Sequence, residues 1–326
     1  MSAAAKEIGG YLELERFPGM PYHEGAVALN SGRGCLAYLA ELRGIRAMWV
    51  PDYMCGCVPA YLSKIGVEVL TYRVGEGMLP DYRSLEISDG EWMLLADYYG
   101  QLREGDVARA LDTSGGRLVV DETQGFFREP WKGADTFYTC RKWFGVADGA
   151  YLATSDGARL GRELPRDESH ARMGFVLGRF ERSASEFYAE ASENNDFFAS
   201  EPAKLMSPIT ENLLRAIDYE AVKSMRNANW DVLEDAFSGV NKLDLRKPDG
   251  AFMYPLMVEG AKEMRRQMIA ESVYIPCLWP DTADSAELPR RLSEGILPLP
   301  VDQRYGAHDM ARVAEAVLGL TGKGAV

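Results

Sequence analysis

The stretch that decides the fold class is Leu118-Val119-Val120-Asp121-Glu122-Thr123-Gln124. Its apolar run ends abruptly in a carboxylate, as a buried strand does when its carboxyl end opens onto a ligand site. Similar short apolar runs alternate with helix-like patterns along most of the 326 residues. This alternation is typical of parallel strands joined by crossover helices, so the sequence predicts an α/β protein.

The spacing of apolar residues places the other elements of this sheet. Asn30-Ser31-Gly32 precedes apolar residues at intervals of three and four, and Gly44 offers a stop, so a helix is expected over Gly32–Arg43. Further helices are expected at Val58–Lys64 and Asp106–Leu111. Strands are expected at Ile45–Val50, Val67–Tyr72, Trp92–Ala96, Leu118–Asp121, Thr136–Cys140 and Ala150–Thr154.

The chain is long enough for two lobes, because a single hydrophobic core nears its size limit at this length. We expect a large domain over residues 1–175, connecting helices over 176–235 and a small α+β domain over 236–326. Pro and Gly gather at 75–80 and 279–300, which we interpret as surface loops. In the small domain, strands are expected at Phe252–Val258, Val273–Ile275 and Ile296–Leu299, and helices at Ala261–Glu271 and His308–Leu318.

Charge and composition narrow the function. The 36 Lys and Arg against 49 Asp and Glu give a net charge of −13, which argues against nucleic acid or an anionic membrane as the main partner. No apolar stretch resembles a signal peptide or a membrane span, so a cytoplasmic protein is expected. The five cysteines are an odd number and the three histidines lie far apart, so neither a disulfide framework nor a metal site is expected.

Asp121 and Lys142 are the candidate catalytic residues. Each follows a predicted strand, so both are expected at the same edge of the sheet. A lysine that forms a Schiff base and a carboxylate that keeps a pyridine nitrogen protonated are what pyridoxal phosphate (PLP) chemistry needs. The alternatives are ordinary ones, because a strand-end aspartate often caps a turn and most lysines are solvated surface charges.

A phosphate anchor is also present in the sequence. Ser31-Gly32-Arg33-Gly34 begins a predicted helix and offers backbone N–H groups at the positive end of a helix dipole. Thr139, three residues before the candidate lysine, adds a hydroxyl. A serine in this position is more often only an N-cap, so the order of the motifs carries the argument rather than any one of them.

This order resembles that of the DegT/StrS-type sugar aminotransferases. The resemblance runs from about Ile8 to Leu320. It implies a fold-type-I PLP-dependent transferase, in which a large lobe with a mostly parallel seven-stranded sheet between helices is followed by a smaller C-terminal α+β lobe. The motifs that carry it are Asn30-Ser31-Gly32-Arg33, Val50-Pro51-Asp52-Tyr53, Tyr99-Gly100-Gln101, Val120-Asp121-Glu122-Thr123-Gln124, Arg141-Lys142-Trp143-Phe144-Gly145 and Asp148-Gly149-Ala150.

The resemblance also implies a role for each matched residue. Lys142 is the lysine that binds the cofactor and moves the proton, and Asp121 is the partner of the pyridine nitrogen. Gln124 matches a glutamine near the phenolic oxygen of the cofactor. The remaining cofactor-binding candidates are Gly32 and Arg33 in the phosphate cradle, Thr139 as a hydroxyl contact and Tyr53 near the ring.

Some residues depart from the family pattern. An aromatic residue usually lies two positions after the match to Tyr53, and this chain has Cys55 there, so either residue is a candidate to face the ring. Trp143-Phe144 is bulkier than the family's glycine-rich stretch and is expected to narrow the site. A second-subunit phosphate contact is sought at Asn194-Asn195, whereas Arg304 and Trp279 are each substrate contacts or ordinary surface and core residues.

We therefore expect a PLP-dependent aminotransferase. The resemblance implies a homodimer with a shared active site, an amino donor such as glutamate, and a keto-sugar acceptor used in polysaccharide or secondary-metabolite synthesis. Two alternatives stay open: a PLP enzyme for elimination, dehydration or decarboxylation, and a non-catalytic scaffold or regulatory subunit with the same fold.

Overall fold

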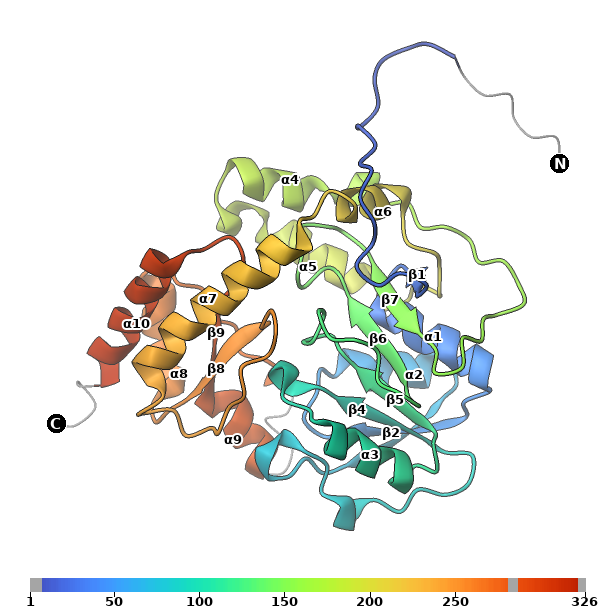
Figure 1. Ribbon diagram of the computed structural model, residues 1–326, viewed down its shortest axis with the longest axis horizontal. Helices are drawn as coiled ribbons and strands as arrows, with labels where there is room; N and C mark the ends of the chain where they lie inside the picture. The colour runs from blue at the N-terminus through green and yellow to red at the C-terminus, as the bar shows by residue number, and fades with distance from the viewer. Residues whose placement is uncertain (1–7, 281–286, 322–326) are drawn as a thin grey trace.

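A seven-stranded sheet forms the centre of the larger lobe in the computed structural model, which describes residues 8–280 and 287–321 (Figure 1). The strand order is β1-β7-β6-β5-β4-β2-β3. The mostly parallel sheet that the sequence predicts is thus confirmed. The strands are β1 (Val27–Leu29), β2 (Ala47–Pro51), β3 (Glu68–Tyr72), β4 (Trp92–Ala96), β5 (Leu118–Asp121), β6 (Asp135–Thr139) and β7 (Ala150–Ala153).

Strand direction brings the carboxyl ends of β1 to β6 to one edge of the sheet. Strands β2 to β6 pair in parallel, whereas β7 is antiparallel to both β6 and β1. Strands β1 and β6 therefore run the same way, and the carboxyl ends of β1, β4, β5 and β6 meet at the same edge. Ligands of open α/β sheets gather at this edge.

Helices cover both faces of the sheet, which explains why its strands read as continuous apolar runs. They are α1 (Gly32–Arg43), α2 (Cys57–Lys64) and α3 (Glu104–Thr113). Helix α1 has the bounds predicted from sequence. It begins at Ser31, whose hydroxyl accepts a hydrogen bond from the Gly34 N–H, and it ends at Gly44 in the left-handed conformation.

Connecting helices lead from the sheet to the smaller lobe. They are α4 (Gly174–Glu181), α5 (Tyr188–Phe197), α6 (Pro208–Leu214) and α7 (Tyr219–Phe237). Helix α7 runs across to the small lobe (Figure 1), where Trp230, Leu233 and Phe237 join its core. The all-helical stretch expected between Arg166 and Phe237 is present, apart from short turns and irregular segments.

The small lobe packs an antiparallel pair of strands against helices. The strands are β8 (Met253–Met257) and β9 (Ile296–Pro300). The helices are α8 (Ala261–Ala270), α9 (Glu287–Gly295) and α10 (Ala307–Thr321). This is the α+β arrangement expected for the C-terminal region, and Tyr254, Leu256 and Leu297 lie in its centre.

Three local expectations differ from the structure. Val273–Ile275 is no strand: Ser272 takes a positive φ of 63°, and the Val273 N–H returns to the Met268 carbonyl, so this apolar run closes the end of α8. The segment 279–300 contains α9 and β9 rather than loop alone. Strand β1 was not expected, because three residues are too few for a pattern.

Candidate active site

A cavity of about 410 Å³ opens at the carboxyl edge of the sheet. Strands β4, β5 and β6, the start of α1 and the end of α5 all contribute to its wall. Of the predicted catalytic and cofactor-binding residues, only Tyr53 is outside the wall, and of the other candidates Asn194 and Arg304 also lie outside it. The cavity is lined by Gly32, Arg33, Asp121, Gln124, Thr139 and Lys142, together with Ser31, Cys55, Cys57, Asp97, Tyr98, Arg141, Asn195, Asp196 and Trp279 among others.

Lys142 lies on the loop that follows β6. The loop turns tightly, since the N–H groups of Trp143 and Phe144 both donate to the Cys140 carbonyl at 2.9 Å. The Lys142 side chain is exposed in the cavity. Desolvation by the surrounding protein lowers its pKa, while Asp121 opposes that shift. A lysine with a lowered pKa releases its proton more readily, as a nucleophile or base requires.

Asp121 ends β5 beside the lysine loop. Its Oδ1 accepts a hydrogen bond of 2.8 Å from the Thr123 N–H, so the turn after the strand fixes the carboxylate. Burial raises its pKa, and the Thr123 contact and Lys142 act in the opposite direction. A cationic group placed against this carboxylate would therefore be strongly favoured.

Gln124 is positioned by a strained turn after β4. Its Oε1 accepts a hydrogen bond of 2.7 Å from the Tyr99 N–H, and Tyr99 has a positive φ of 56° that is rare for a side chain of this size. Because its carbonyl oxygen is engaged, the amide nitrogen is the end that can donate into the cavity.

The start of α1 forms a candidate anion cradle in the same cavity wall, next to Thr139. The N–H groups of Gly32 and Arg33 lie in the first helical turn, where they have no partner within the helix. A Cβ at Gly32 would lie 2.9 Å from the Thr139 side chain, so only glycine fits there. The buried Oγ1 of Thr139 has no hydrogen-bond partner in the described part of the chain.

Two arginines lie at this end of the cavity. The Arg33 Nη2 donates to the Asn195 backbone carbonyl at 2.9 Å, and the Arg141 Nη1 donates to the Asn195 Oδ1 at 2.8 Å. Arg141 was not predicted as a site residue, although it directly precedes the candidate lysine. Asn195 belongs to the pair considered as a second-subunit contact, and here it lies in the cavity of its own chain.

Aromatic side chains from both lobes form another wall. Tyr98 and Trp279 line the cavity, with their ring centres 5.4 Å apart. Tyr53 is fully buried behind them, with its ring centre 4.7 Å from that of Trp279. Of the two candidates to face a cofactor ring, Cys55 therefore lines the cavity and Tyr53 does not. Trp279 belongs both to the wall and to the core cluster around Tyr53.

Cys55 and Cys57 lie together in this wall, with their Sγ atoms 2.8 Å apart. Within residues 8–280 and 287–321, no three His, Cys, Asp or Glu side chains gather in a way that could hold a metal ion. In the same ranges, every helix is too short or too polar to cross a bilayer.

A buried carboxyl pair supports the cavity from behind. Asp97 is the first residue after β4, and Glu122 is the first residue after β5, whose last residue is Asp121. The Arg128 Nε is 3.4 Å from Asp97 and 3.6 Å from Glu122, and the Trp131 indole donates to Glu122. Burial and Asp97 raise the pKa of Glu122 well above its usual range. The same strand-end signal that identified Asp121 would have identified Asp97.

The loop after Lys142 is anchored away from the cavity. Trp143 and Phe144 are buried among Phe126 and Phe127, so they do not narrow the site as expected. Asp148 accepts hydrogen bonds from the Ser207 N–H and hydroxyl at 2.7 Å, and from the Thr210 hydroxyl.

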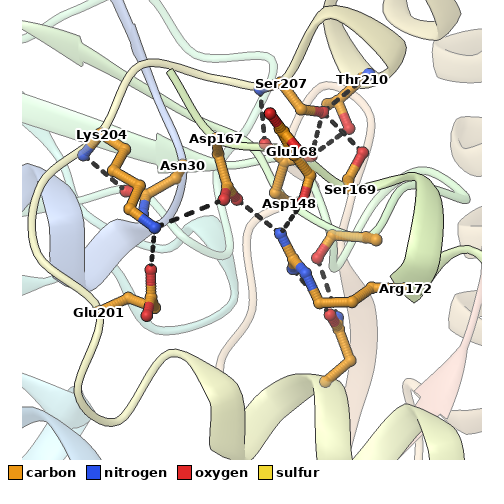
Figure 2. A network of polar contacts seen from close by, with 12 residues as sticks. Asn30, Asp148, Asp167, Glu168, Ser169, Arg172, Glu201, Lys204, Ser207 and Thr210 are labelled. Atoms are coloured by element: carbon orange, nitrogen blue, oxygen red, sulfur yellow. Dashed lines mark hydrogen bonds and ion pairs between the residues drawn. The ribbon is translucent and has the colours of Figure 1, made fainter. Parts of the chain in front are cut away.

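Figure 2 shows this anchor beside a second group of charges, in which Asp167 lies between Arg172 and Lys204. Gly149 completes the turn with a φ of 113°, where a Cβ would lie 2.9 Å from Thr210. The loop that carries Lys142 is thus held by a polar network in the connecting segment.

A larger cavity of about 780 Å³ lies farther along α5, between the connecting helices and the small lobe. Several aromatic residues lie in its wall, including Phe175, Phe187 and Tyr305. Arg304 also lines it, but both ends of its guanidinium bind Asp302, at 2.7 and 2.9 Å. This pairing agrees with the interpretation of Arg304 as a residue paired with its neighbour.

Comparison with known proteins identifies solved structures with a similar fold. No family model matches the chain, and no curated protein matches it in sequence. Spr1654 from Streptococcus pneumoniae, described as a sugar aminotransferase in its PLP form, is similar with a TM-score of 0.65 and 12% identity, over 91% of this chain and 87% of that chain.

Two further structures agree. The sugar aminotransferase CalS13 from Micromonospora echinospora has a TM-score of 0.64 and 14% identity, over 90% of this chain and 86% of that chain. The aminotransferase TlmJ from Streptoalloteichus hindustanus has a TM-score of 0.64 and 16% identity, over 93% and 87%. The chain therefore has the fold of the PLP-dependent sugar aminotransferases.

Proposed function

We propose that this chain is a PLP-dependent aminotransferase that transfers an amino group from glutamate to a keto sugar or a sugar-like ketone. One observation carries the proposal: Lys142, the carboxylate of Asp121 and the anion cradle at Gly32 all line a single cavity. The fold supports it, because the similar protein Spr1654 is described in a PLP form.

The residues present fit this cofactor. The unpartnered Oγ1 of Thr139 and the N–H groups at the start of α1 offer hydrogen bonds that a phosphate can accept. The glycine at position 32 lets the start of α1 pack closely against Thr139 and Phe137, which brings the helix N–H groups and the Thr139 side chain together. Arg33 and Arg141 add positive charge at the same end.

When bound, PLP supplies an electron sink that stabilises a carbanion next to the amino group. With PLP bound, Lys142 would be the residue that holds the cofactor covalently through its aldehyde, and its Nζ would hold and move the proton that transamination requires. Its lowered pKa leaves more of the amine unprotonated at neutral pH, which suits both tasks.

Asp121 and Gln124 act on the ring. The Asp121 carboxylate, fixed by the Thr123 N–H, keeps the pyridine nitrogen protonated. Gln124 donates its amide N–H to the phenolic oxygen, since its Oε1 is already engaged by Tyr99. Trp279 and Tyr98 limit the space available to the ring on the aromatic side.

The acceptor sugar occupies the larger cavity in this proposal. Both cavities lie along α5, with Ala191 in the wall of one and Asn195 in the wall of the other, so they adjoin one turn apart. The aromatic rings of Tyr188 and Tyr305 offer stacking surfaces for a sugar. The amino sugar formed would then serve polysaccharide or secondary-metabolite synthesis.

We also propose that the working form is a homodimer with its active sites near the subunit interface. Apolar side chains on α4 support this assembly, because Leu177 is 62% exposed and Phe180 is 93% exposed. Analytical ultracentrifugation of the purified chain measures the assembly directly. A monomer at working concentration would contradict it.

The deciding experiment is the visible absorbance spectrum of the purified protein, recorded before and after adding PLP and then glutamate. A band of lysine-bound cofactor that converts to the pyridoxamine form is the expected result. Borohydride treatment followed by peptide mass spectrometry then identifies the residue that carries the cofactor, which we expect to be Lys142.

Other outcomes point elsewhere. A band that does not respond to glutamate retains the cofactor but indicates another donor or another reaction, such as elimination, dehydration or decarboxylation. The absence of any band favours a non-catalytic scaffold. Product analysis with keto-sugar acceptors separates transamination from the other PLP reactions.

A further inference from the structure

Arg33 and Arg141 converge on one residue at the phosphate end of the cavity. Asn195 receives both guanidinium groups, one on its backbone carbonyl at 2.9 Å and the other on its side-chain Oδ1 at 2.8 Å. The Arg141 guanidinium also lies 4.4 Å from the centre of the Phe198 ring. Both arginines are thus held in place by uncharged partners.

Neither of these two arginines forms an ion pair with an acid of the described residues, and Asp148 acts on Arg141 only as a weaker influence on its pKa. Among residues 8–280 and 287–321, no carboxylate lies within ion-pairing distance of either guanidinium, although Asp196 lines the same cavity. Arg172, on the other side of Phe198, shows the contrast because it pairs with Asp167 at 2.6 Å. The start of α1 adds further positive charge.

Desolvation of Arg141, with Arg33 and Arg172 nearby, is consistent with this imbalance. Together they lower its pKa to about 10. An arginine keeps its charge at that value, so crowded positive charge persists at neutral pH. Such a group is stabilised when an anion enters the cavity.

We propose that Arg141, together with Arg33, binds the phosphate group of the cofactor, and that Asn195 is the residue that positions both. The proposal rests on the proposed function. It makes the phosphate site complete within one chain: α1, the Thr139 hydroxyl and two arginines surround the anion without a residue from a second copy.

The connecting segment fixes Asn195 in place. Its neighbour Asn194 donates to the Ala147 carbonyl at 2.8 Å and accepts from Arg172 at 3.0 Å. Arg172 in turn binds Asp167 in the network of Figure 2. The end of α5 is therefore tied to the loop that carries Lys142, and the phosphate end is preorganised before any ligand binds.

The test compares PLP with pyridoxal, which lacks the phosphate. Arg141→Met is expected to weaken PLP binding by roughly 10- to 100-fold, the range for one charged hydrogen-bonded contact, and to leave pyridoxal binding unchanged. Arg141→Lys should restore part of the PLP affinity. Arg46→Met, which removes an exposed arginine outside the cavity, is the matched control. Dissociation constants are measured by absorbance titration.

Asn195→Asp separates positioning from simple packing. The new carboxylate still accepts from Arg141, and the unchanged backbone carbonyl still accepts from Arg33. The added negative charge offsets the positive charge of the arginines, so the cofactor-free protein should melt at a higher temperature while PLP binds more weakly. Asn195→Ala should lower both. A lower melting temperature together with equal losses of PLP and pyridoxal affinity in Asn195→Asp would show that Asn195 only supports the fold.

Inorganic phosphate tests the site independently of PLP. Phosphate should raise the melting temperature of the wild type but not of Arg141→Met. If wild-type protein binds neither PLP nor pyridoxal, the proposed function fails, and the phosphate shift still decides this inference. Equal PLP affinity in wild type and Arg141→Met overturns the inference, as does loss of PLP affinity when the protein is diluted below its dimer dissociation constant.

Discussion

The two ends of the active-site cavity are opposite in charge and in construction. At one end, Gly32, Arg33 and Arg141 present backbone N–H groups and guanidinium groups that form no ion pair with an acid of the described residues. At the other, Asp121 presents a carboxylate. Lys142 lies on the loop next to Arg141, and Asp121 acts on its pKa. If the proposed function holds, this difference in charge would favour a ligand with a phosphate and a basic ring, bound in one orientation.

The largest loss of activity is expected from removing the amino group of Lys142. Lys142→Ala should abolish the covalent link to the cofactor and lower turnover by at least roughly 10²- to 10⁴-fold, the usual contribution of one acid–base group. Binding at the two ends should persist, so PLP should still bind without a covalent link. Absorbance spectra and glutamate turnover measure this, with Lys132→Ala as the exposed control.

An intact band of lysine-bound cofactor in Lys142→Ala would assign the covalent role to another residue. Thermal melting of both variants should match the wild type, because the Lys142 side chain is exposed in the cavity and supports no core packing. A large drop in melting temperature would make the activity result uninterpretable as a catalytic effect.

Asp121→Asn tests the end of the cavity where Asp121 lies, which we call the ring end. The variant keeps the shape and the contact with Thr123 but loses the charge, so turnover should fall by roughly 10- to 1,000-fold, because an opposite charge shifts a neighbouring pKa by about 1 to 3 units. Stabilisation by inorganic phosphate should be unchanged, since that probe reports on the other end. Near-normal turnover in Asp121→Asn would remove this residue from the mechanism.

The buried carboxyl pair of Glu122 and Asp97 is expected to make the stability of the protein depend on pH. The pKa of Glu122 is raised in the folded protein, so the folded state holds a proton that the unfolded chain has released. The free energy of unfolding should therefore fall as the pH rises above about 4.3, the ordinary value for glutamate. Glu122→Gln should flatten this dependence, because the amide donates to Asp97 and accepts from Trp131.

Urea unfolding of wild type and Glu122→Gln at several pH values measures the slope. The two proteins should differ most at alkaline pH, where Glu122→Gln is the more stable. Parallel curves would mean that the pKa of Glu122 is not raised in the folded protein.

The smallest effect on stability and on PLP affinity is expected at Arg304, which lies outside the active-site cavity. Arg304→Ala removes an ion pair with Asp302 whose arginine side chain is 53% exposed, and such pairs are worth about 0 to 1 kcal/mol. Affinity for PLP should not change. Urea unfolding and a PLP titration check both points, and a loss of PLP affinity comparable to that of Arg141→Met would extend the phosphate end into the larger cavity.

The sequence predicts the ring end better than the phosphate end for a physical reason. Asp121, Gln124 and Lys142 follow strands directly, so a local pattern and the rule for parallel sheets place them together. Asn195 reaches Arg141 only because α5 folds back over the cavity, 54 residues later in the chain. No local sequence pattern predicts this contact between Asn195 and Arg141.

The aromatic wall shows the same limit. Trp279 comes from a segment whose pattern indicates only a loop, and its ring lies against Tyr53 and Tyr98 of the other lobe. Whether Tyr53 or Cys55 faces the cavity depends on how the chain turns after β2, which residue spacing does not determine. The structure turns Cys55 inward and buries Tyr53.

The position of Trp279 gives the protein a built-in optical reporter. Its indole forms part of the cavity wall, and indole emission overlaps the absorbance of a pyridoxal chromophore. Energy transfer should therefore quench its fluorescence as the cofactor enters. Trp279→Phe, compared with the unchanged protein, would isolate that signal and follow cofactor entry in real time.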